Sequence, residues 1–125
     1  MSSVERWAEQ ARYDLETADA MQRSGRYLYV LFCCQQAVEK AIKALITKQT
    51  QKFPPRIHNL VRLAEVATLE LSDERAQLLR ELSNYYIQTR YPEEIPELAA
   101  KISETQSRQI LEQTEETIQW LLSMI

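Results

Sequence analysis

Apolar residues recur every three or four positions along most of this chain, which is the spacing that places side chains on one face of an α-helix. The clearest apolar stripe consists of Tyr27, Val30, Leu31, Cys34, Ala37, Val38, Ala41, Ile42 and Leu45. It predicts a helix from about Tyr27 to about Lys48 with this face in the core. One glycine and four prolines in 125 residues leave few helix breaks. We therefore expect a single all-α domain.

Similar patterns predict the other elements. We expect helices from Val4 to the stop at Ser24-Gly25, from His58 to about Ala67, from Asp73 to Gln88, and from about Glu97 or Ser103 to Ser123. The first two helices should form an antiparallel hairpin, because the link between them is very short. Pro54-Pro55 should end the second helix, and residues 90–96, which include two prolines, are expected to form a loop.

A second, polar stripe follows the helix predicted at Tyr27, and consists of Gln36, Glu39, Lys40 and Lys43. Glu39 stands four residues before Lys43, the favourable order for a helical ion pair. The stripe is typical of a solvated helix face. Alternatively, its lysines and glutamine could contact a phosphate or a base edge, because lysine supplies positive charge and glutamine supplies both donor and acceptor groups.

Composition narrows the classes of function. A net charge of −3 disfavours nonspecific DNA binding. The only cysteines, Cys33 and Cys34, are adjacent within a predicted helix, which indicates a reduced, intracellular protein. No apolar stretch approaches the roughly 20 residues of a membrane span, so a cytoplasmic location without membrane association is expected. A single histidine and no zinc-ligand or glycine-rich phosphate motif predict neither metal nor cofactor.

Two local groups remain as candidates for chemistry. His58 follows Pro54-Pro55 and could hydrogen-bond a loop carbonyl or face a ligand. Tyr85, Tyr86, Arg90 and Tyr91 combine aromatic rings with a cation, which suits base stacking and phosphate binding. The same residues could instead pack in the core and cap a helix.

In their order along the chain, several short segments resemble the HEPN domain, a family of small helical proteins named for higher eukaryotes and prokaryotes nucleotide-binding. The similar residues span Ala11 to Pro92. They are Ala11 to Leu15 with Ala18; Gly25, Tyr27, Phe32, Gln36, Ala37, Glu39, Lys40, Lys43 and Ala44; Pro55, His58 and Leu60; and Arg90, Tyr91 and Pro92.

The resemblance implies an up-and-down four-helix bundle with an additional short helix, commonly a homodimer. Such proteins are often encoded beside a separate minimal nucleotidyltransferase, and several branches act in toxin-antitoxin pairs. Apolar Phe32 and Ile46, outside the main stripe, and two tryptophans near the chain ends also favour a homodimer. The contacts to a nucleotide or to the nucleotidyltransferase partner are then expected from Gln36, Lys40, Lys43, His58, Arg90 and Tyr91.

Ribonuclease branches of the family carry an arginine followed after four to six residues by a histidine, a pair that can act at a scissile phosphate. After Arg90, that histidine would stand at Ile95, Pro96 or Glu97. Before His58, the arginine would stand at Gln51, Lys52 or Phe53. The missing pair favours a non-catalytic nucleotide-binding or interaction module. An RNA-cleaving toxin with an atypical site and a purely structural dimer are the alternatives.

Overall fold

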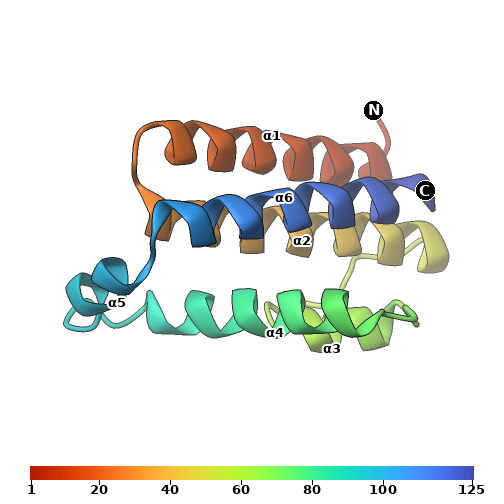
Figure 1. Cartoon of the computed structure of the whole chain (residues 1–125). Helices are drawn as coiled ribbons and strands as arrows, with labels where there is room; N and C mark the ends of the chain where they lie inside the picture. Colours follow the sequence, from red (N-terminus) through yellow and green to blue (C-terminus); the bar gives the residue numbers. More distant parts are fainter.

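Six helices make up the chain in a computed structural model that describes residues 1–125. They are α1 (Ser3–Arg23), α2 (Tyr27–Thr50), α3 (Leu60–Val66), α4 (Asp73–Gln88), α5 (Ile95–Lys101) and α6 (Glu104–Ser123), and there is no strand (Figure 1). The expected all-α bundle is confirmed, with α1, α2, α4 and α6 as its long helices. It carries two short helices, α3 and α5, where one was expected. No helix has the length and apolarity that a membrane span requires.

The first two helices form the predicted antiparallel pair. The Ser2 side chain caps α1 by accepting from the Glu5 N–H. Gly25 has a φ of +78°, which a glycine adopts readily, and it turns the chain between the two helices. On α1, alanines at positions 8, 11 and 18 are buried, and their small side chains allow α2 to approach closely.

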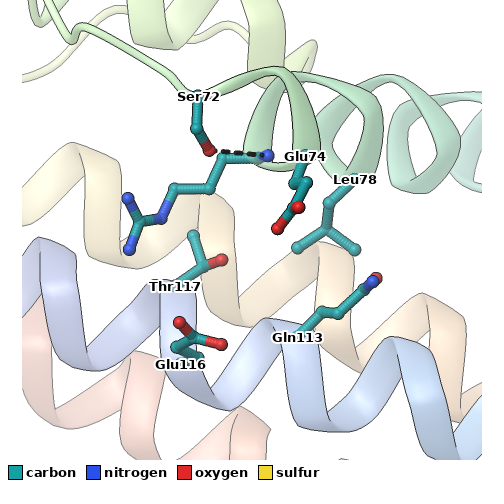
Figure 2. Close-up of a pocket in the computed structure, with 7 residues that line it drawn as sticks. Ser72, Glu74, Leu78, Gln113, Glu116 and Thr117 are labelled. Atoms are coloured by element: carbon teal, nitrogen blue, oxygen red, sulfur yellow. Dashed lines mark hydrogen bonds between the residues drawn. The ribbon is translucent and has the colours of Figure 1, made fainter.

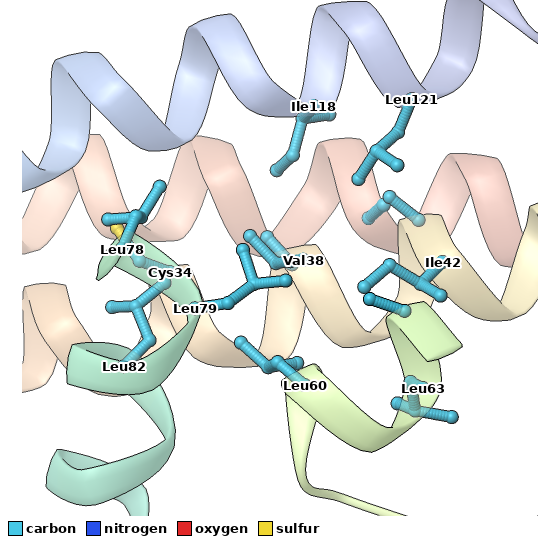
Figure 3. Packing of buried hydrophobic residues seen from close by; sticks show 14 of the residues in the cluster. Cys34, Val38, Ile42, Leu60, Leu63, Leu78, Leu79, Leu82, Ile118 and Leu121 are labelled. Carbon is cyan, nitrogen blue, oxygen red and sulfur yellow. The ribbon is translucent and has the colours of Figure 1, made fainter. Parts of the chain in front are cut away.

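α2 is the central helix and packs against each of the other five. Figure 3 shows its Val38 and Ile42 between side chains of α3, α4 and α6. Each such fully buried aliphatic side chain contributes about 1.5–3 kcal/mol relative to exposure. α1 lies on one side of α2 and α3 and α4 lie on the other, while α6 is drawn across α2 and contacts α1, α2 and α4 (Figure 1). One side of α2 therefore faces the α3–α4 layer, where residues distant in sequence come together.

Two predicted helix boundaries were wrong. α3 begins at Leu60 rather than at His58, because the Asn59 side chain accepts from the Arg62 N–H and caps the helix there. Residues 90–96 are not entirely a loop, since α5 begins at Ile95. Pro96 sits in its first turn, where a missing N–H costs nothing.

The start of the last helix agrees with the later of the two expected positions. Ser103 and Gln106 form a reciprocal capping box, in which the Ser103 side chain accepts from the Gln106 N–H and the Gln106 side chain accepts from the Ser103 N–H. α6 therefore begins at Glu104, after a short break from α5.

The polar stripe of α2 is not a solvated face. The Glu39 and Lys43 side chains are each 7% exposed, because α1 and the loop before α3 cover them. Ile46, expected at a dimer surface, is 2% exposed and belongs to the core. Both tryptophans are half-buried under cations, with Lys43 over Trp7 and Arg75 over Trp120.

Candidate functional site

The Glu39 carboxylate is the centre of a buried polar network. Its Oε2 accepts from Lys43 Nζ at 3.0 Å, and its Oε1 accepts from Gln35 Nε2 at 3.1 Å. Gln35, Glu39 and Lys43 are four residues apart, so α2 places them on one face, a turn from one another. His58 Nδ1 lies 3.2 and 3.1 Å from the two carboxylate oxygens. The predicted Glu39–Lys43 ion pair is thus present, and it is buried and shared with His58.

His58 is fixed through both its backbone and its ring. Gln35 Nε2 also donates to the His58 carbonyl oxygen at 3.0 Å, which ties the loop before α3 to α2. With Nδ1 facing a carboxylate, the hydrogen-bond network assigns a proton to Nδ1. The other nitrogen, Nε2, is then the one available to a ligand. The side chain is 51% exposed, so solvent and ligands can reach it.

The imidazole lines a cavity of about 160 Å³, which we call the His58 pocket. Its walls are His58, Asn59, Ser83, Tyr86, Ile87 and Arg90. Ser83, Tyr86 and Ile87 share one face near the end of α4, and Arg90 follows in the turn after that helix. The Ser83 hydroxyl accepts from the Leu60 N–H at 3.0 Å, which joins the start of α3 to α4 at the pocket.

Tyr86 positions Arg90. Arg90 Nη2 donates to the Tyr86 hydroxyl at 2.6 Å, and the guanidinium carbon lies 4.7 Å from the centroid of the Tyr86 ring. That ring is 5.7 Å from the His58 ring and is stacked with Phe32 at 5.9 Å. None of the chain's ion pairs involves Arg90. The guanidinium therefore keeps its charge and most of its N–H donors for a ligand.

The structure brings together two of the six residues predicted as contacts, His58 and Arg90. Lys43 points from Glu39 toward α1, with its Nζ 5.7 Å from the centroid of Trp7. Lys40 pairs with Asp14 of α1, and Gln36 donates to the Gln35 side chain at 2.9 Å.

Tyr91 is exposed and does not line the pocket. Among the predicted contacts, Gln36, Lys40, Lys43 and Tyr91 thus lie outside the pocket, and their role in ligand or partner binding stays a prediction.

Sequence reasoning missed Glu39, Ser83 and Asn59 as parts of the site. Glu39 had one usable signal, since Gln35, Glu39 and Lys43 repeat at four-residue spacing. The helical spacing of Ser83 and Tyr86, shortly before Arg90, was a second signal. Neither pattern reveals that His58 contacts both α2 and α4, because those contacts depend on how the loop before α3 packs against the two helices.

A second hollow, of about 150 Å³, lies between the start of α4 and α6 (Figure 2). Its lining includes the carboxylates of Glu74 and Glu116, and its one cation, Arg75, stacks on Trp120 at 4.1 Å. Two carboxylates repel an anion. The His58 pocket, whose own lining has no carboxylate, suits a phosphate better.

The long helices around α2 and the polar pocket at the end of α4 define a small helical bundle with a candidate ligand site. The chain belongs to the HEPN domain family, whose model matches residues 4–124. The resemblance seen in the sequence is therefore confirmed. Membership supports a nucleotide-binding or RNase-like module.

Two solved structures are similar over nearly the whole chain. TT1696 from Thermus thermophilus is 25% identical with a TM-score of 0.84, and the match covers 100% of both chains. ST0689, an archaeal HEPN homologue, is 24% identical with a TM-score of 0.76 and 98% coverage of each chain, and it shows the shared fold. No curated protein matches the chain.

Proposed function

We propose that the His58 pocket binds the phosphate of a nucleotide or an RNA, and that the protein is a non-catalytic binding module. The observation that carries this proposal is the meeting of His58 and Arg90, 32 residues apart in sequence, at the wall of one cavity. His58 is fixed by the buried carboxylate of Glu39, and Arg90 has no acidic partner.

The balance of charge favours an anion. Lys43 offsets the charge of Glu39 beneath the pocket, so Arg90 provides a net positive charge at its wall. A guanidinium can donate two parallel N–H groups to phosphate oxygens. The Ser83 oxygen accepts from Leu60, which leaves the Ser83 O–H free to donate to a ligand.

The proposed partner is a separately encoded minimal nucleotidyltransferase, with a toxin-antitoxin pair as one form of this pairing, and this part rests on family membership. We also propose a homodimer. Two exposed apolar side chains, Ile87 in the pocket wall and Tyr91 next to Arg90, would contribute to the contact with the nucleotidyltransferase or to the dimer interface.

The binding proposal is tested by titrating AMP and a short RNA into the purified protein and its variants by calorimetry. Arg90→Met should weaken phosphate binding at least about tenfold, because a charge-assisted hydrogen bond contributes about 1.5–3 kcal/mol. Arg80→Met is the matched control, since Arg80 is an exposed arginine of α4 that contacts Gln77 and does not line the pocket. If the Arg90→Met variant and the unchanged protein bind with equal affinity, the His58 pocket does not bind the phosphate.

One observation favours RNA cleavage as a second candidate function. A buried carboxylate at 3.1 Å from a histidine that lines a cavity is the arrangement of a general base and its orienting group. Incubating the purified protein with RNA tests this. If the protein cleaves RNA and the His58→Ala variant does not, the protein is a ribonuclease. If the protein binds RNA without cleaving it, the non-catalytic binding module is supported.

A further inference from the structure

We infer that the His58 pocket accepts a terminal phosphate, a phosphomonoester at the end of a nucleotide or RNA, rather than a phosphodiester within a strand. This inference rests on the proposed function, because it specifies which phosphate the same pocket binds.

Size is the first reason. Pockets that enclose a drug-sized ligand measure roughly 300–1,000 Å³. The His58 pocket measures about 160 Å³ and has room for one head group but not for a nucleoside. A terminal phosphate can enter alone and leave its nucleoside outside, whereas an internal phosphate must bring two flanking sugars to the same opening.

Charge is the second reason. The charged or titratable side chains at the pocket and directly behind it are Glu39, Lys43, His58, Tyr86 and Arg90. Glu39 and Lys43 offset each other, so the remaining charge is that of Arg90. A phosphomonoester carries about −1.5 to −2 near pH 7, against −1 for each phosphate within a strand. The uncompensated charge of Arg90 therefore attracts the more negative terminal group more strongly.

The placement of polar groups is the third reason. Arg90, His58 and Ser83 approach the cavity from the turn after α4, from the loop before α3 and from α4 itself. A terminal phosphate presents three strong acceptor oxygens, and a phosphodiester has one fewer that is unesterified. Arg90 and Ser83 supply N–H and O–H donors. His58 Nε2, which accepts while the proton is on Nδ1, can pair with the protonated oxygen of a singly charged terminal phosphate, a group that a phosphodiester lacks.

The rim offers a surface for the part of the ligand that stays outside. Ile87 lines the opening and is half-exposed, whereas the Tyr86 ring is stacked with Phe32 and has the Arg90 guanidinium over it. Apolar surface such as that of Ile87 can pack against a base without selecting its sequence.

The test compares two RNAs of one sequence, labelled at the 3′ end, that differ only in a 5′-phosphate or a 5′-hydroxyl. Fluorescence anisotropy should show at least about tenfold tighter binding of the phosphorylated RNA, as expected for the loss of a charge-assisted contact. Arg90→Met should reduce this preference to about onefold, and Arg80→Met should retain it. AMP should compete with the phosphorylated RNA, whereas adenosine, which lacks the phosphate, should not. Binding of AMP without binding of either RNA would identify a mononucleotide as the ligand.

The outcomes distinguish a failure of this inference from a failure of the proposed function on which it rests. Equal binding of the two RNAs, with affinity still lost in Arg90→Met, would overturn the terminal-phosphate inference and leave phosphate binding standing. Absence of binding by both RNAs and by AMP would overturn the proposed function itself. A preference for 5′-phosphate that survives Arg90→Met would also overturn the inference, because the terminal group would then bind elsewhere.

Discussion

Glu39 is the residue that connects the stability of the bundle to the geometry of the site. Its carboxylate holds Gln35, Lys43 and His58 at 3.0–3.2 Å. Glu39→Ala should lower the free energy of unfolding by about 3–5 kcal/mol, because it leaves the Lys43 ammonium buried without a counter-charge. Urea unfolding followed by circular dichroism measures this loss.

Replacing both partners provides the control. The double variant Glu39→Leu with Lys43→Met removes both buried charges and should recover most of the stability that Glu39→Ala loses. A Glu39→Ala variant within about 0.5 kcal/mol of the unchanged protein would show that the network contributes little to folding.

Lys40 should affect stability and leave the site unchanged. It pairs with Asp14 across α1 and α2, and both side chains are largely buried. Lys40→Ala should therefore cost about 1–2 kcal/mol, between the values for exposed pairs and for charged hydrogen bonds. Its affinity for AMP should be unchanged when both quantities are measured on one preparation. If Lys40→Ala instead lowers the affinity for AMP without lowering stability, Lys40 contacts the ligand.

At the scale of elements, the long helices were predictable and the short ones were not. α2 and α6 carry several turns of apolar periodicity, so their existence does not depend on any one residue. α5 has only seven residues, too few for a periodic stripe, and Pro96 resembles a breaker when its place in the first turn is unknown. The start of α3 depends on Asn59, which caps the helix. From the sequence alone, an asparagine at this position could equally form a turn.

In the site as well, contacts within one helix were predictable from the sequence and contacts between elements were not. The Glu39–Lys43 pair is a contact within one helix and was predicted from spacing, whereas its burial depends on where α1 packs. Likewise, Arg90 and His58 were each identifiable as candidates. Their convergence with Glu39 and Ser83 required the packing of α2, α3 and α4, which no local pattern encodes.

Packing of α6 near α1 makes stability depend on pH at Glu115. Partial burial, with Asp19 and Glu112 nearby, raises the pKa of Glu115 above its ordinary value of 4.5. The folded state therefore holds this proton more tightly than the unfolded state, and ionised Glu115 opposes folding once the pH exceeds the raised pKa. Glu115→Gln should raise the melting temperature at pH 7, with the gain disappearing as the pH falls below about 4.5.

The control for this pH effect is Glu116→Gln, which alters the adjacent, exposed carboxylate. Melting curves at pH 7 and pH 4 measure both variants. An equal gain at the two pH values would show that the Glu115 substitution acts through packing rather than through the charge.

At the scale of the whole molecule, the exposed apolar side chains predict self-association. Tyr13, Tyr29, Ile87 and Tyr91 are each at least half exposed and are large enough to anchor an interface. We expect light scattering coupled to chromatography to give the mass of a dimer at micromolar concentration. A strictly monomeric mass would contradict this expectation and would leave those residues for a different partner.

The most direct test of phosphate binding at the His58 pocket is a titration of isotope-labelled protein with AMP, followed residue by residue by nuclear magnetic resonance. The largest shift changes are expected at His58, Asn59, Ser83, Tyr86 and Arg90, where three segments meet around one cavity. Changes confined to other residues, such as those of the hollow between the start of α4 and α6, or no saturable change, would contradict phosphate binding at the His58 pocket.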